Sequence, residues 1–267
     1  MENSTMELKS GLVSITFRKK TSKEVVALVA EAGLDGIEWG GDVHVPHGDL
    51  AKAREIRRMC EDNGIAIPSY GSYYRAGVSE MDGLSFQSVL DSSMELGAET
   101  IRIWAGKASN ELSADERCAV VDDILRVATL AGDAGVFVGL EFHSGTLTDS
   151  NESVSSLLKE LEGVDNISLY WQPRVGDSVE DALFSMSLVL PRLGNLHVYH
   201  WLLDDDGALD QRPLLEGKDE WTRYFSAVVS SVNKPRISRY AMLEFVCGGE
   251  AKQFLDDAVV LRALCSE

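Results

Sequence analysis

Residues 22–38 read SKEVVALVAEAGLDGIE, and this stretch contains the unit from which the fold is built. Apolar residues recur at helical spacing from Ser22 to Ala32, which predicts an amphipathic helix. Gly33 then ends the helix, because glycine adopts the left-handed conformation without steric cost. The run Leu34–Glu38 follows and predicts a short strand. The chain is therefore expected to turn from helix to strand at Gly33.

The same helix–glycine–strand unit recurs along the chain. Successive turn glycines are 31, 33, 38, 28 and 31 positions apart, at Gly33, Gly64, Gly97, Gly135, Gly163 and Gly194. The later five precede the predicted strands Ile65–Ile67, Thr100–Ile103, Val136–Leu140, Ile167–Tyr170 and Leu196–Val198. An opening strand, Leu12–Thr16, and a late one, Met242–Val246, bring the number to eight, and a last helix over Gly249–Cys265 ends the chain.

Eight such units predict a parallel α/β architecture, a (β/α)8 TIM barrel that forms a single domain over residues 1–267. A doubly wound open sheet is the alternative. That alternative usually needs fewer strands, and no GxGxxG motif follows the first predicted strand.

Composition narrows the functional class. The chain has 25 basic and 43 acidic residues and a net charge of −18, so it repels phosphate backbones and is not expected to bind nucleic acid. No apolar run approaches the roughly 18 residues that span a membrane, and the start lacks the apolar segment of a signal peptide. Four cysteines without CxxC spacing are typical of reduced thiols. We therefore expect a cytoplasmic protein; assembly into a homo-oligomer stays open.

The rare side chains gather after the predicted strands, where TIM-barrel enzymes place their active sites. All five histidines and four of the five tryptophans lie at or just beyond a strand's C-terminal end. They are His44, His47, His143, His197, His200, Trp39, Trp104, Trp171 and Trp201. This distribution predicts a polar pocket with aromatic walls at the mouth of the barrel.

Four adjacent strands end on residues that can bind a metal ion. Predicted strands five to eight end on Glu141, Gln172, His197 and Glu244. Oxygen ligands with one imidazole suit a divalent ion such as Mn²⁺, Mg²⁺, Co²⁺ or Zn²⁺. A glutamate between apolar neighbours is costly to bury without a partner, and one shared cation would be a partner for both Glu141 and Glu244.

Each of these residues also has a purely structural alternative. Glu141 and Glu244 could pair with arginines of the barrel, and His197 could be a hydrogen-bonded core histidine. Gln172 could form hydrogen bonds only. Arg102, near the end of the fourth predicted strand, could bind an anionic substrate group or pair with Glu141.

These strand ends resemble those of the xylose isomerase-like TIM barrels of the sugar phosphate isomerase/epimerase superfamily. The matching pieces are GIEWGGD at 36–42, LEFH at 140–143, LHV at 196–198 and LEFV at 243–246, and the resemblance covers nearly the whole barrel. In that family Glu, Asp, His and Glu hold a metal, which implies the ligands Glu141, Gln172, His197 and Glu244. Gln172 departs from the family's Asp, and the loss of one negative charge predicts weaker metal binding.

The resemblance implies a metal-dependent sugar or sugar-phosphate isomerase or epimerase. The metal would bind the carbonyl oxygen, and Glu141 and Glu244 would move a proton on opposite faces of the neighbouring carbon. The small sugar-derived substrate would be bound by Trp39, Arg102, Trp104, His143 and His200, with Trp171 as a further apolar wall; the two histidines are expected in the pocket rather than on the metal.

Three other functions compete with this interpretation. A dehydratase that acts on a cyclic polyol ketone, of the inosose type, would use the same metal and the same proton abstraction. A catalytically weakened, sugar-binding barrel is favoured if Gln172 abolishes the metal site. A DNA-repair endonuclease of the AP type, which shares the barrel, needs a multi-zinc cluster and a positive face, and the charge of −18 disfavours it.

Overall fold

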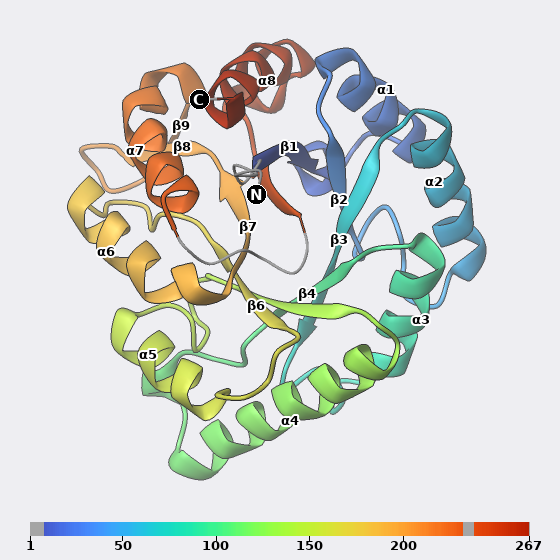
Figure 1. Ribbon diagram of the computed structural model, residues 1–267, viewed down its shortest axis with the longest axis vertical. Helices are drawn as coiled ribbons and strands as arrows, with labels where there is room; N and C mark the ends of the chain where they lie inside the picture. The colour runs from blue at the N-terminus through green and yellow to red at the C-terminus, as the bar shows by residue number, and fades with distance from the viewer. Residues whose placement is uncertain (1–7, 232–237, 267) are drawn as a thin grey trace, which may run out of the picture. The chain divides into compact units, whose positions relative to one another are not determined.

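The computed structural model describes residues 8–231 and 238–266, in which eight parallel strands form a closed barrel (Figure 1). Their order around the barrel is β1-β10-β7-β6-β5-β4-β3-β2. The strands are β1 (Leu8–Val13), β2 (Gly36–Gly40), β3 (Ala66–Arg75), β4 (Thr100–Trp104), β5 (Phe137–Glu141), β6 (Ile167–Trp171), β7 (Leu193–Val198) and β10 (Arg239–Leu243). The helices are α1 (Ser22–Ala32), α2 (Leu50–Asp62), α3 (Phe86–Leu96), α4 (Ala114–Asp133), α5 (Asn151–Glu160), α6 (Val179–Val189), α7 (Lys218–Val229) and α8 (Ala251–Ser266). The predicted TIM barrel is confirmed.

The chain groups into two compact units. One comprises the described residues up to Glu38, Met59–Ala66 and the chain from Trp171 onward. In this unit β1 pairs in parallel with β10 and β2, and β10 pairs with β7. The other comprises Trp39–Arg58 and Ile67–Tyr170, in which β4 pairs with β3 and β5, and β5 pairs with β6.

Local sequence signals explain how several helices begin and end. Thr21 begins α1 with a capping box, in which its hydroxyl accepts from the Glu24 N–H and the Glu24 carboxylate accepts from the Thr21 N–H. Gly33 ends the helix at φ 64°, and its N–H donates to carbonyl oxygens of the last turn. The predicted limits of this helix, Ser22 and Ala32, are confirmed.

The predicted turn at Gly194 is wrong. The other five turn glycines have positive φ, but Gly194 lies inside β7. The preceding helix α6 instead ends in a short 3-10 turn over Leu190–Arg192 that contains Pro191. Because proline cannot donate a hydrogen bond to the preceding helical turn, it ends a helix where no glycine is needed.

The first and last barrel strands are displaced from their predicted positions. The first strand is Leu8–Val13, and Ser14–Phe17 forms a buried 3-10 turn in which Phe17 packs edge-on against Phe254 at 5.4 Å. An apolar run alone does not distinguish a strand from a buried turn. The last strand ends at Leu243, because Phe245 has φ 52° and leaves the extended conformation.

A two-stranded hairpin was not predicted. The strands β8 (His200–Leu203) and β9 (Leu209–Arg212) pair antiparallel in the loop that follows β7. Among the residues that the structure describes, no helix combines the length and hydrophobicity needed to cross a membrane.

Candidate active site

Glu141 is the last residue of β5, and two donors from β4 hold its carboxylate. Arg102 forms an ion pair through Nη1 with Glu141 Oε2, and Trp104 Nε1 donates to the same oxygen at 2.6 Å. Both side chains of the ion pair are buried. Of the two roles predicted for Arg102, the structure shows the pair with Glu141. The guanidinium compensates the charge of a carboxylate that would be costly to bury alone.

His197 lies in β7 between two carboxylates. Its Nδ1 is 3.3 Å from Glu244 Oε2, and its Nε2 is 3.6 Å from Glu38 Oε1. All three side chains are buried, and those of His197 and Glu38 are 1% and 0% exposed. Such an imidazole can bind a metal through one nitrogen while a carboxylate orients it through the other.

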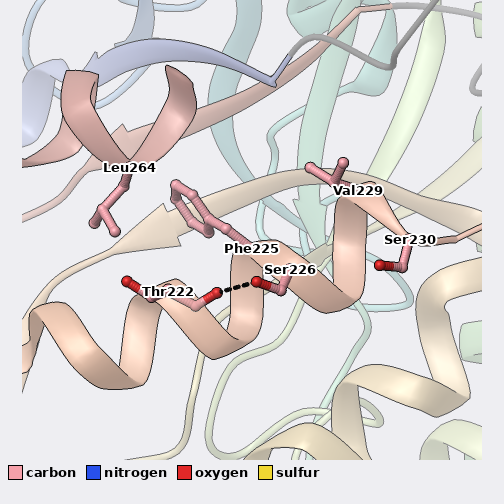
Figure 2. Close-up of a pocket in the computed structure, with 6 residues that line it drawn as sticks. All are labelled: Thr222, Phe225, Ser226, Val229, Ser230 and Leu264. Carbon is pink, nitrogen blue, oxygen red and sulfur yellow. Dashed lines mark hydrogen bonds between the residues drawn. The ribbon is translucent and has the colours of Figure 1, made fainter. Parts of the chain in front are cut away.

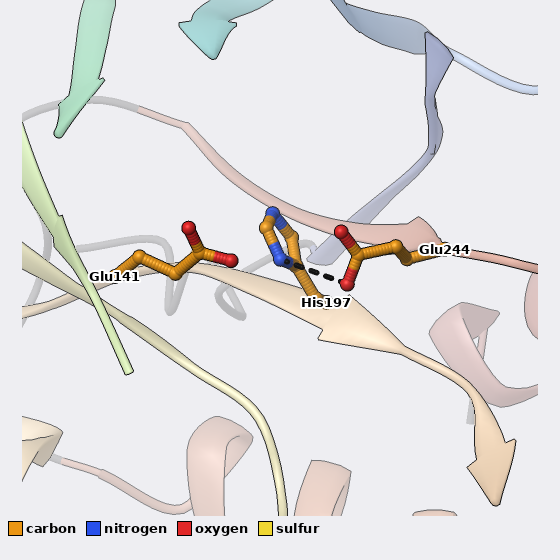
Figure 3. Close-up of side chains that lie close together, drawn as sticks. All are labelled: Glu141, His197 and Glu244. Carbon is orange, nitrogen blue, oxygen red and sulfur yellow. Dashed lines mark ion pairs between the residues drawn. The ribbon is translucent and has the colours of Figure 1, made fainter. Parts of the chain in front are cut away.

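One group of residues in the described part of the chain has the geometry of a metal site. Ligand atoms of Glu141, His197 and Glu244 lie within 4.8 Å of one another (Figure 3). Two ligands at about 2.0–2.6 Å from one ion are at most about 5 Å apart, so this spacing fits a single divalent ion. The buried triad is consistent with a divalent metal site.

The turn after β10 fixes the position of Glu244. The Glu244 N–H donates to the Val198 carbonyl at 3.0 Å, one residue beyond the last strand. The next residue, Phe245, is left-handed at φ 52°, and its N–H donates to Thr16 Oγ1 at 3.0 Å. A left-handed bulky residue is uncommon and is found where surrounding contacts hold it. Here these two hydrogen bonds hold the turn that immediately follows the carboxylate.

An aromatic cluster surrounds Trp104. Its ring lies 4.6 Å from the His143 ring and 5.3 Å from the Tyr73 ring, measured between centroids. The Arg75 guanidinium stacks over the same indole at 4.6 Å. His143 and Trp104 were predicted in the pocket, whereas Tyr73 and Arg75, at the end of β3, were not.

The other predicted pocket residues have separate surroundings. Trp39 in β2 is fully buried, with its ring edge-on to His44 at 5.6 Å. His200 begins β8, and its Nδ1 is 4.0 Å from Glu220 Oε2. Gln172 directly follows β6 and is half-buried, with its side-chain oxygen Oε1 inside the protein. The substrate roles of Trp39 and His200 and the metal role of Gln172 remain predictions.

Trp171 does not form the predicted apolar wall. Its Nε1 donates to Ser185 Oγ of α6 at 3.0 Å, and its ring packs edge-on against Trp221 and Tyr224 of α7. The side chain therefore faces the helices that cover the strand.

Glu38 is the acidic residue that the site prediction missed. It lies in β2 between the buried residues Ile37 and Trp39. The same signal, a glutamate inside an apolar strand, had identified Glu141 and Glu244. It could have identified Glu38 as well.

A hollow between α7 and α8 does not have the chemistry of an active site (Figure 2). It is lined by Thr222, Phe225, Ser226, Val229, Ser230 and Leu264. Ser226 Oγ donates to the Thr222 carbonyl at 2.7 Å. This lining offers hydroxyl and apolar groups, without an acid, base or charged metal ligand.

Comparison with known proteins places the barrel in a family. Residues 26–254 match the profile of the xylose isomerase-like TIM barrels. The chain belongs to this family. The match confirms the predicted superfamily, whose members differ in reaction and substrate.

Proteins that are similar to this chain in sequence or in fold include dehydratases and an epimerase. The chain is similar to a 3-dehydroshikimate dehydratase from Bacillus anthracis, with 27% identity over 167 residues, which span 58% of each protein. It resembles the crystal structure of a probable 3-DHS dehydratase involved in petrobactin synthesis from the same organism, with a TM-score of 0.76 and 21% identity. The match covers 96% of this chain and 99% of the dehydratase. It also resembles the structure of a D-psicose 3-epimerase, with a TM-score of 0.66 and 17% identity, over 96% of this chain and 97% of the epimerase.

Proposed function

We propose that this family member is a metal-dependent dehydratase that removes water from a cyclic hydroxyketone of the 3-dehydroshikimate type. The buried triad Glu141, His197 and Glu244 carries the proposal, because it combines a metal-ligand set with carboxylates that can move a proton. The similarity to a dehydratase favours dehydration over the isomerisation or epimerisation predicted from the sequence.

The residues of the site fit a divalent cation. Glu38, Glu141 and Glu244 are three buried carboxylates, and Arg102 pairs with one of them. Buried negative charges are costly unless cations compensate them, and a doubly charged ion would do so. Carboxylate oxygens with one imidazole suit Mn²⁺, Mg²⁺, Co²⁺ or Zn²⁺, and we propose Gln172 as a further oxygen ligand.

Within this proposal the side chains have distinct tasks. A bound ion would polarise the substrate carbonyl and so acidify the neighbouring carbon. His197 would bind the ion through Nδ1 while Glu38 orients the ring from the side of Nε2. Glu244 would remove the proton beside the carbonyl and return it to the departing hydroxyl group. The C–O bond then breaks, a C=C bond forms and water leaves.

The surroundings of Glu141 favour a reaction that needs a single carboxylate base. Epimerisation with two bases would use Glu141 and Glu244 on opposite faces of one carbon. The donors Arg102 and Trp104 already occupy Glu141 Oε2, which makes this carboxylate less available as a base. Dehydration needs only one carboxylate base, and Glu244 can be that base.

A substrate panel tests the proposed reaction. The protein with Mn²⁺ is incubated in deuterated water with 3-dehydroshikimate and, separately, with a set of ketoses, and the products are read by NMR. We expect 3-dehydroshikimate to lose water and give a dihydroxybenzoate, with the ketoses unchanged. Deuterated, epimerised or isomerised ketoses together with intact 3-dehydroshikimate would instead establish the isomerase or epimerase function.

A further inference from the structure

Arg75 lies at the end of β3, beside the aromatic cluster. Its guanidinium stacks on Trp104 at 4.6 Å. Its Nη1 donates to the Gly106 carbonyl at 2.5 Å and approaches the Gly145 carbonyl at 3.4 Å. These contacts hold the side chain in place, but both acceptors are neutral.

Arg75 has no acidic partner within residues 8–231 and 238–266. Arg102, Arg117 and Arg126 each form an ion pair with a glutamate, and Arg75 forms none with the described carboxylates. Burial lowers the pKa of Arg75, and no neighbouring acid counteracts this effect. Arginine nevertheless stays protonated, so a half-buried positive charge remains uncompensated.

One indole joins this charge to the candidate active site. The face of Trp104 contacts Arg75, and its Nε1 donates to Glu141 at 2.6 Å. A small molecule bound to the guanidinium at this indole would therefore lie close to Glu141. The remaining donors of a guanidinium match the two oxygens of a carboxylate.

The negative charge of the whole protein favours a fixed local cation for the binding of an acidic substrate. With a net charge of −18, the molecule repels anions. A fixed guanidinium beside the site would offset this repulsion for a ligand that carries its negative charge at one end.

We propose that Arg75 binds the carboxylate group of the substrate and selects acidic hydroxyketones over neutral sugars. This inference rests on the proposed dehydratase function and names the group that decides its specificity.

A pair of ligands that differ in one carboxylate tests this role. 3,4-Dihydroxybenzoate and catechol share the diol, and only the first is anionic. Calorimetry with Mn²⁺ present would compare wild type, Arg75→Gln, Arg75→Lys and the control Arg117→Gln, whose arginine pairs with Glu160 at 2.8 Å. We expect wild type to prefer the dihydroxybenzoate. In Arg75→Gln its affinity should fall about tenfold or more, because one charge-assisted contact is lost. Catechol affinity should stay unchanged, Arg75→Lys should retain part of the preference, and the control should match wild type.

The outcomes separate this inference from the proposed function. An equal loss of affinity for both ligands in Arg75→Gln would mean that Arg75 only supports the loops at Gly106 and Gly145, and would overturn the inference. A wild-type protein that does not prefer the dihydroxybenzoate to catechol would also overturn it. A preference that depends on Arg75 in a protein that does not dehydrate 3-dehydroshikimate would uphold the binding site and refute the function. Dehydration of 3-dehydroshikimate with a kcat/KM that is unchanged in Arg75→Gln would uphold the proposed function and refute the role of Arg75.

Discussion

Glu141 and Glu244 have the same side chain in different surroundings. Arg102 and Trp104 both contact one oxygen of the Glu141 carboxylate. Glu244 lies beside His197 and follows the last strand, where the left-handed Phe245 turns the chain. This difference leads us to assign the proton transfer to Glu244.

Replacing Glu244 with glutamine should stop the chemistry and preserve the fold. Glutamine keeps the shape and one coordinating oxygen but cannot accept a proton. We expect dehydration and solvent deuterium exchange to slow by about 10²–10⁴, the usual contribution of a general base. The rates are compared at matched metal occupancy, with circular dichroism as the folding control. If exchange is as fast as in wild type, Glu244 acts only as a ligand or structural group.

The Gln172→Asp variant should bind Mn²⁺ more tightly than wild type. The new carboxylate supplies negative charge directly after β6, where the family has aspartate, and an anionic oxygen attracts a divalent ion more strongly than an amide oxygen. Calorimetric titration with Mn²⁺ measures the change. Unchanged or weaker affinity would show that Gln172 faces away from the ion or that the site requires a neutral ligand.

At the scale of single residues the sequence predicted the triad but not its supports. Glutamates inside apolar strands signal buried charge, and the same pattern was present at Glu38. The contacts of Arg75 and Tyr73 with Trp104 could not be predicted, because β3 runs on to Arg75, far beyond the predicted Ile67. Polar residues in that extension concealed the strand.

At the scale of elements, glycine turns set where helices end and strands begin. Gly64 and Gly135 have φ 67° and 74°, and a Cβ added at either would meet nothing within 4 Å. A substitution at these positions therefore changes the backbone energy without a clash.

Gly64→Ala and Gly135→Ala should each lower the free energy of unfolding by about 1 kcal/mol, because alanine is strained in the left-handed conformation. Urea denaturation of the two single variants measures this loss. A variant as stable as wild type would mean that the turn relaxes to another conformation.

The missed elements have identifiable causes. At α6, Pro191 replaced the expected glycine stop. The loop between β8 and β9 contains the dipeptide Asp206-Gly207, a turn signal that often connects paired strands, but each of the two strands has only four residues. Repetition of the helix–strand unit predicts the barrel, whereas an insertion in one loop breaks the repeat.

At the scale of the whole molecule, the prediction of a single domain remains a proposal. Neither compact unit is continuous in the sequence, since the unit that contains Met59–Ala66 also contains the chain from Trp171 onward. We expect chemical unfolding to show one cooperative transition that coincides for tryptophan fluorescence and circular dichroism. Two separated transitions would establish that the units unfold independently.

The proposed dehydration depends on one divalent ion at Glu141, His197 and Glu244. Chelator-treated protein is titrated with Mn²⁺ while 3-dehydroshikimate turnover is measured, and His197→Ala is treated in parallel. We expect turnover to be lost on chelation and to return in proportion to added ion, with a plateau at about one ion per chain, and the variant to need far more Mn²⁺. Full turnover in the metal-free protein, or identical titrations for wild type and His197→Ala, would contradict the claim.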